Sequence, residues 1–519
     1  MATGLARPMG ARSGARSPAL RLVNSLERRL APLDRAILGV EWRQATGRAT
    51  RGAASLQRRR LALLAEPGQA ERLRSAMRGL GVPTQRRRAE LLLRTTLEVQ
   101  IEQAPEIVRL RDPLVRRINA FHPRWKGRVS SRGALWEIQR SNPDRTERQA
   151  AWQKEEPLFR PMEPALARLV ALRNSRAREF GFRSFPEYRL AAEGLTPSRL
   201  RELMDAATRW VPDEMARARE EFEDATGERG WYPWDALYAQ HLRAPMPEAS
   251  FPGDRTLPAV LRGVRAWGIP SSLLRFRVDF HDLPAGGISL APDPPRDVRV
   301  VVHPQGGWEQ YGILFHEVGH AIASGAVRQP SHLLRWHEHV PGFAAMSEGE
   351  GGFFERIAST EAWLRTRPGL SPEQVANAVA SVRRGILYNT AWTVVWISRE
   401  LALYEDGPRG TDRVAKRLGR RLFGYESHEP LSFADGFSVE LPLYSPSYFL
   451  AGLFGSALRR AVLAEVGGPL WPNRKVGPWL LRHWMREGTS FDWTTRLREL
   501  TGAPFDARAF LAETRPGTK

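Results

Sequence analysis

Most of this chain follows a helical hydrophobic pattern, and that pattern sets its fold class. From about residue 25 to residue 245, apolar residues recur at steps of three and four, as in "PALARLVALRNSRAREFGF". This spacing places them on one face of an α-helix. Short polar stretches such as "SNPD" and "LTPS" supply turns and helix starts between the patterns. Helical patterning resumes at residue 309 and continues almost to the end, so we predict a mainly α-helical protein.

The exception lies between about residues 272 and 305. There "LLRFRVDFHDL" alternates apolar and polar residues, and "VRVVVHP" is a β-branched run that follows the turn-rich "GGISLAPDPPRD". These features predict a small antiparallel sheet. It stands directly before a helical stretch that carries two histidines, and a strand edge in such a place can pair with an extended peptide.

The length of 519 residues allows a large core, in one domain or in two lobes. We expect a basic, disordered tail at 1–24 and a single domain over 25–515, with approximate lobes at 25–245 and 246–515. The longest apolar runs are interrupted and too short to span a bilayer, so no transmembrane helix is predicted.

The amino-terminal stretch "MATGLARPMGARSGARSPALRL" has basic residues but no continuous apolar segment, which argues against a secretory signal peptide. Its acid-free, Arg/Ser/Ala-rich character is also typical of an organellar transit peptide. Arginine and alanine are enriched throughout the chain, however, so we expect a cytoplasmic protein.

A formal net charge of +21 raises the hypothesis of a nucleic-acid partner. Lysine occurs only at 126, 154, 416, 475 and 519, whereas arginine is spread along the chain beside abundant alanine, glycine and proline. That distribution indicates a coding bias. The arginine runs at 58–60 and 86–88 fall in helical patterns and are typical of solvated faces. We therefore do not predict nucleic-acid binding as the main function, nor a membrane partner.

The most specific motif is "HEVGH", in which His316 and His320 stand four residues apart. In a helix both side chains project from one face and can bind a single ion. Glu317 would lie beside that ion, where a carboxylate can hold and deprotonate a water molecule. The chain has no cysteine, so a metal site here must use His, Asp or Glu.

A catalytic zinc ion needs a third protein ligand and an open fourth position. The first downstream stretch that offers candidates is "HLLRWHEH", with His332, His337, Glu338 and His339. The second is "AMSEGEGGFFERIAS", with Glu348, Glu350 and Glu355. Glu348 and Glu355 are two helical turns apart and share a face, whereas Glu350 does not. We predict Glu348 as the third ligand of one Zn²⁺ per chain, and Glu355 as a group that accepts a ring N–H from a ligating histidine.

Together, "HEVGH" and "SEGEGGFFE" resemble the glutamate-zincin oligopeptidases, the group of thimet oligopeptidase and oligoendopeptidase F, and more distantly angiotensin-converting enzyme. Weaker segments such as "RNSRAREFGFRSFPEYRL" and "GAPFDARAFLAE" extend the resemblance over roughly 25–515. His320 and Glu348 are 28 residues apart here, a slightly longer spacing than in that family.

The resemblance also implies tyrosines that hydrogen-bond the oxyanion opposite the metal. The matching stretch, "LPLYSPSYFLAGLFGSALRRA", offers Tyr448 as the first choice and Tyr444 as the second. Packing at a helix start is the alternative for both. The family places a histidine shortly before these tyrosines, whereas the nearest upstream histidine here is His428. Substrate preference is therefore not carried over.

The resemblance implies a two-lobed helical fold with a deep central channel, a sheet beside the HExxH helix, and zinc-dependent hydrolysis of short unfolded peptides. A carboxypeptidase or dipeptidyl carboxypeptidase on the same scaffold is the alternative within enzymes. A non-catalytic protein that keeps the fold and binds peptides or a partner is the alternative from another class. The sequence sets neither peptide specificity nor oligomeric state.

Overall fold

In the computed structural model, the described residues are 17–515 apart from 51, 244–245, 282, 284–285, 305, 336–339 and 426–435. The helices before the sheet are α1 (Pro18–Ala45), α2 (Ala53–Leu64), α3 (Gln69–Gly79), α4 (Pro83–Glu102), α5 (Pro105–Asn119), α6 (Arg132–Ser141), α7 (Arg145–Gln153), α8 (Glu156–Phe159), α9 (Glu163–Glu179), α10 (Phe185–Ala192), α11 (Pro197–Ala207), α12 (Val211–Thr226), α13 (Ala236–Arg243) and α14 (Thr256–Arg265). A two-residue hairpin pair, β1 (Arg124–Trp125) and β2 (Arg128–Val129), interrupts them.

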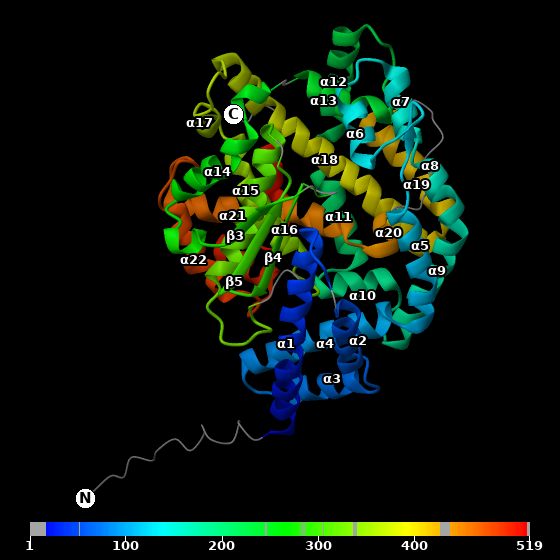
Figure 1. Cartoon of the computed structure of the whole chain (residues 1–519), viewed down its shortest axis with the longest axis vertical. Coiled ribbons are helices and arrows are strands. Elements are labelled where there is room, and N and C mark those ends of the chain that lie inside the picture. Colours follow the sequence, from blue (N-terminus) through cyan, green and yellow to red (C-terminus); the bar gives the residue numbers. More distant parts are fainter. Residues whose placement is uncertain are drawn as a thin grey trace, which may run out of the picture.

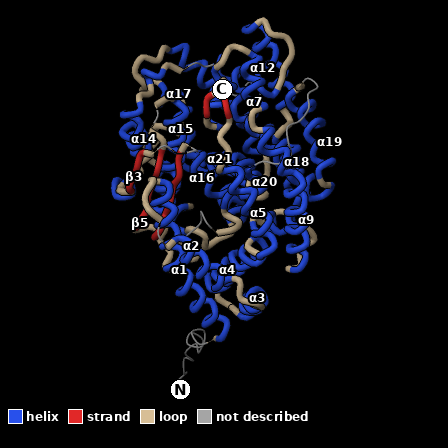
Figure 2. Tube along the Cα trace, turned by 45° about the vertical axis from the view of Figure 1, so that its right-hand side comes forward, coloured by secondary structure: helices blue, strands red, loops and turns tan. Residues whose placement is uncertain are grey.

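The second half holds β3 (Arg277–Phe280), β4 (Gly287–Asp293) and β5 (Asp297–Val302), followed by α15 (Trp308–Ala326), α16 (Ala344–Glu355), α17 (Glu361–Leu364), α18 (Pro372–Asp406), α19 (Pro408–Leu418), α20 (Gly436–Glu440), α21 (Ser445–Val466), α22 (Val476–His483), α23 (Trp493–Thr501) and α24 (Arg508–Thr514). Figure 1 shows α1–α4 together at one end and the sheet beside α15, while α18 crosses the molecule diagonally. Figure 2 shows how small the strand content is. The prediction of a mainly α-helical fold is confirmed.

The first helix begins within the stretch 1–24 that the sequence analysis assigns to a tail. Helix α1 begins at Pro18, and the Ser17 side chain accepts a hydrogen bond from Leu20 N, a standard N-cap. Residues 18–24 belong to this helix, and the Leu20 and Val23 side chains are buried in the core. Residues 1–16 lie outside the described residues. Division of the remaining chain into two lobes around a channel stays a prediction.

The sheet has the strand order β3-β5-β4. The β4–β5 pairing is antiparallel, as expected, but β3 runs parallel to β5, so the predicted antiparallel sheet is in fact mixed. The last strand in sequence thus lies in the middle. This explains the composition of β5, because Val300, Val301 and Val302 are fully buried between neighbours on both sides.

Two helices cover the sheet, and one of them carries the histidines. On one face Leu38 and Trp42 of α1 pack against Leu290 and Val301. Helix α15 packs against β4 and β5, and its apolar residues join the main core, which includes residues from Leu20 to Phe510. No helix among the described residues is long and apolar enough to cross a membrane.

Candidate metal centre

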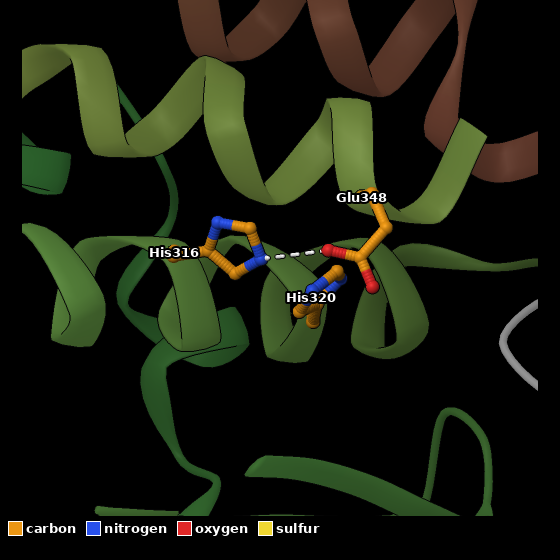
Figure 3. Close-up of side chains that lie close together, drawn as sticks. All are labelled: His316, His320 and Glu348. Carbon is orange, nitrogen blue, oxygen red and sulfur yellow. Dashed lines mark ion pairs between the residues drawn. The ribbon is translucent and has the colours of Figure 1, made fainter. Parts of the chain in front are cut away.

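Helix α15 carries His316 and His320 one turn apart on the same face, and their ring centroids are 4.7 Å from each other. His320 and Glu317 are each 8% exposed. Helix α16 runs beside α15 and directs Glu348 at the two imidazoles (Figure 3). One ligand atom from each of these three residues lies within 4.8 Å of the other two. The HExxH helix and the third-ligand candidate are thus brought together as the sequence pattern predicts.

Glycines let the helices around this group approach closely. A Cβ atom at Gly351 would stand 2.5 Å from His316 Nε2, and one at Gly319 would stand 3.0 Å from the Phe354 side chain. A Cβ at Gly349 would overlap the Phe454 ring of α21. Gly349 and Gly351 therefore let α16 pack closely between the histidine helix and α21.

Each of the two histidines has a hydrogen-bond partner at its Nδ1 atom. His316 Nδ1 lies 3.2 Å from Glu355 Oε2, and His320 Nδ1 lies 3.2 Å from Ser347 Oγ. With both Nδ1 atoms engaged, Nε2 is the ring nitrogen through which each histidine would bind an ion. Glu355 thus has the contact expected of it, while Ser347 carries no signal in the sequence because any small polar residue could precede Glu348.

The electrostatics of the group favour a cation. Burial would raise the pKa of Glu348 and of Glu355, but hydrogen bonds and charge attraction from His316 hold each pKa below the usual value. Burial would likewise lower the pKa of His316, and the hydrogen bonds to Glu348 and Glu355 raise it well above its usual value. The carboxylates are therefore anionic, and their negative charge surrounds the imidazoles.

Glu317 lies between the metal-ligand candidates and the first residues of β4. A Cβ atom at Gly287 would stand 2.6 Å from Glu317 Cγ, so this strand passes directly against the predicted base. Since β4 is an edge strand in the order β3-β5-β4, the base lies next to a strand edge.

The two tyrosines lie at the start of α21. Tyr444 precedes its first residue and donates its hydroxyl to Glu348 Oε1 at 2.9 Å. The Tyr448 ring centroid is 5.4 Å from that of Tyr444, and its side chain is 41% exposed. Burial, followed by the charge of Glu348, raises the pKa of both phenols. Both therefore stay protonated and can donate a hydrogen bond at neutral pH.

The remaining candidates stand elsewhere or cannot be placed. His332 Nε2 lies 3.2 Å from Asp34 Oδ2 of α1, away from the group. Glu350 Oε1 accepts a hydrogen bond from Trp484 Nε1 at 2.5 Å. His337, Glu338, His339 and His428 lie outside the described residues.

The donor set fits zinc. Two imidazole nitrogens and one carboxylate oxygen are a known ligand combination of catalytic zinc, which keeps its fourth position for water or substrate. A search of the described residues for three or more His, Asp or Glu side chains close enough to hold one ion finds His316, His320 and Glu348.

Comparison with solved structures places the fold. The chain is similar to the M32 carboxypeptidase from Deinococcus radiodurans R1, with a TM-score of 0.67 and 17% sequence identity, over 96% of this chain and 98% of the other. At this identity the likeness shows a shared fold. The shared fold is that of a carboxypeptidase, and it does not single out the oligopeptidases. No protein-family model matches the chain, and no curated protein matches it in sequence.

Proposed function

We propose that this chain is a zinc-dependent peptidase that acts on short unfolded peptides. The observation that carries the proposal is the convergence of His316, His320 and Glu348 from two helices, with Glu317 beside them. The fold that this protein shares with a solved M32 carboxypeptidase over nearly the whole chain supports it. His316, His320 and Glu348 would hold the ion. A zinc ion bound there supplies a Lewis acid for the peptide carbonyl and lowers the pKa of water.

The chain's own residues carry the proton transfers. Glu317 takes the proton from the attacking water and later delivers it to the amine that leaves. Tyr448 donates its hydroxyl to the oxyanion that develops on the carbonyl oxygen, and its protonated state suits it to do so. Tyr444 orients Glu348 through the hydrogen bond between them. The edge of β4 beside Glu317 aligns an extended peptide with the base.

The mode of cleavage has two candidates. The resemblance in sequence favours internal cleavage of oligopeptides, whereas the structural neighbour is described as a carboxypeptidase. The near-complete coverage of both chains favours the carboxypeptidase mode. The cleavage products separate them, because a carboxypeptidase releases single residues and requires a free terminal carboxylate.

The experiment compares the purified protein with Glu317→Gln on a library of quenched peptides, each with a free or an amidated carboxyl terminus, followed by mass spectrometry. Both proteins are brought to equal zinc content. We expect the variant to lose about 10²- to 10⁴-fold in rate, since it lacks the general base. Glu309→Gln, on the first turn of the same helix and 72% exposed, is the matched control and should keep full activity.

Chelation should abolish cleavage, and added zinc should restore it. Cleavage that survives in Glu317→Gln, or that is indifferent to the chelator, would contradict the proposal. A folded, zinc-loaded protein that binds peptides without cleaving them would support the non-catalytic alternative instead. A steep salt dependence of binding to nucleic acid, with no chelator effect, would point to nucleic-acid binding instead.

A further inference from the structure

The segment that bears the two tyrosines is held by charged groups from other helices. Glu400 of α18 is 5% exposed, and its Oε1 accepts a hydrogen bond from Leu443 N at 2.6 Å. Its Oε2 accepts one from Ser445 Oγ at 3.1 Å. The two bonds therefore bracket Tyr444, which stands between the residues that donate them.

The backbone at this point is in an unfavourable conformation. Leu443 has φ +56°, in the left-handed region that residues with a Cβ atom rarely adopt. Such a conformation persists where the surroundings hold it in place. The short hydrogen bond from the Leu443 amide to the buried Glu400 carboxylate is such a constraint. Breaking it would cost free energy, because the buried amide would lose this acceptor and the carboxylate would lose this donor.

The other end of the segment is fixed in the same manner. Arg173 of α9 is fully buried and donates from Nη1 to Ser438 O at 2.7 Å and from Nη2 to Val439 O at 2.8 Å. The carbonyl groups at the end of α20 are thereby tied to α9. With the chain held at both places, the Tyr444 hydroxyl reaches Glu348.

We propose that Glu400 is a positioning residue of the metal centre: it holds Leu443 in the left-handed conformation and so places Tyr444 on Glu348 and Tyr448 beside it. This assignment rests on the proposed function for its effects on catalysis and on zinc affinity, but not for its effect on the order of the segment. Its structural consequence concerns the order of residues 438–446 and the affinity of the His316, His320 and Glu348 group for zinc. Both are measured without substrate.

The first test is hydrogen exchange followed by mass spectrometry on the full chain. Glu400→Ala should speed amide exchange in peptides that cover 438–446 by at least about tenfold, because the anchoring bonds limit opening there. Glu405→Ala, one turn further along α18 and paired with Arg201 at the surface, is the control and should leave exchange in that segment unchanged. Unchanged exchange in folded Glu400→Ala would overturn the proposal.

The second test is a double-mutant cycle on zinc affinity, measured by competition with a chromophoric chelator. Tyr444→Phe should weaken zinc binding by about 10-fold or more, as expected for a lost partner of a ligand. Glu400→Ala should weaken it by a similar factor, and the double variant should be no weaker than Tyr444→Phe alone. Additive losses would show that Glu400 acts by another route and would overturn the proposal.

The third test is rescue. Glycine adopts a positive φ without a steric penalty, so Leu443→Gly in the Glu400→Ala background should regain part of the zinc affinity. Glu400→Gln keeps an acceptor for the Leu443 amide and should lie close to the parent protein. If Glu400→Ala does not fold, Ser445→Ala removes one of the two bonds and should give a smaller loss of the same kind. No loss in Ser445→Ala and no rescue by glycine would contradict the assignment.

Peptide cleavage adds an independent readout. Glu400→Ala should lower kcat while KM changes little, since the tyrosine donors act on the transition state. If the parent protein cleaves no peptide but the exchange and zinc results are as expected, the proposed function fails and the positioning role stands. If cleavage is normal in the parent and unaffected in Glu400→Ala, the positioning role fails and the function stands.

Discussion

The α15–α16 pair and the tyrosine segment at 438–448 contribute to the same site but are built differently. In the helix pair, His316 and His320 are fixed by one helix, and Glu348 and Glu355 by another, so the spacing within each helix determines which side chains meet. The tyrosine segment joins the end of the short helix α20 to the start of α21 through a left-handed residue, Leu443, before Tyr444. Its position depends on side chains from helices that are distant in sequence.

The two regions are therefore held in place by different interactions. Helical hydrogen bonds and core packing hold the metal-ligand candidates, and most of α15 is buried. The position of the tyrosines depends on a few hydrogen bonds that the buried side chains of Glu400 and Arg173 make with the segment. Substitutions in the helix pair should therefore affect metal binding first. In the tyrosine segment, loss of the Tyr448 donor should affect turnover, whereas loss of the Tyr444 hydroxyl, which contacts Glu348, should also weaken metal binding.

The largest effect is expected for His320→Ala, which removes one of the proposed ligands from the helix pair. Zinc binding should be lost, and peptide cleavage should fall by about 10³-fold or more. The measurement is zinc content after dialysis, together with the initial rate. His122→Ala, at an exposed position outside the site, is the control. Retained zinc and activity in His320→Ala would show that the helix pair does not hold the metal as proposed.

Tyr448→Phe tests the other region. The ring and its packing remain, but the donor is removed, so kcat should fall by about 10²- to 10³-fold with zinc affinity unchanged. The measurement is kcat and KM on one peptide beside a zinc titration. A loss of zinc affinity equal to that of a ligand variant would show that Tyr448 acts on metal binding and not on turnover alone.

Gly351→Ala is a smaller change that tests the close packing of the helix pair. The added methyl group would stand 2.5 Å from His316 Nε2, whose ring is also held by Glu355, so the imidazole must move. Zinc affinity should fall by about tenfold. Gly352→Ala is a matched control, because nothing lies within 4 Å of its added Cβ atom. Equal zinc affinities in the two variants would contradict the close-packing account.

The smallest catalytic effect is expected for Glu27→Gln. The Glu27 carboxylate accepts a hydrogen bond from Ser331 Oγ at 2.6 Å, in the loop that follows α15, and also pairs with Arg88. The variant should unfold more easily by about 1–3 kcal/mol at pH 7 and keep kcat. Denaturant unfolding and a rate measurement check this. A fall in kcat without a loss of stability would contradict it.

The pH dependence of that variant has a definite sign. Burial would raise the pKa of Glu27, but the hydrogen bonds from Ser331 and Arg88 outweigh it and lower the pKa below 4.5. A lowered pKa in the folded state means that the carboxylate stabilises the protein above pH 4.5, and that this stability is lost as the pH falls further. The difference in unfolding free energy between the parent protein and Glu27→Gln should therefore narrow below about pH 4.5.

The helix pair could be predicted from the sequence because its geometry is periodic. A spacing of four places His316 and His320 on one face, and a spacing of seven places Glu348 and Glu355 on another. The structure brings His316 between the two carboxylates, with Nε2 3.5 Å from Glu348 Oε2 and Nδ1 3.2 Å from Glu355 Oε2. Their roles as ligand and supporting group remain predictions until a metal is located.

The remaining features join residues that no local pattern relates. Glu400 contacts Leu443 across 43 positions, and Arg173 contacts Ser438 across 265. The sheet shows the same limit. Alternating residues revealed that strands exist, but not that β5 would insert between β3 and β4 and run parallel to β3. The choice of neighbours depends on packing against α1 and α15, which the strand sequences do not encode.

The central claim is that zinc binds to His316, His320 and Glu348. The measurement is a crystal structure of the zinc-loaded protein with diffraction data collected on both sides of the zinc absorption edge. We expect one anomalous peak about 2.0–2.2 Å from a ring nitrogen of His316, a ring nitrogen of His320 and an oxygen of Glu348. A peak held by other residues, or none at these three side chains in a protein that cleaves peptides, would contradict the central claim.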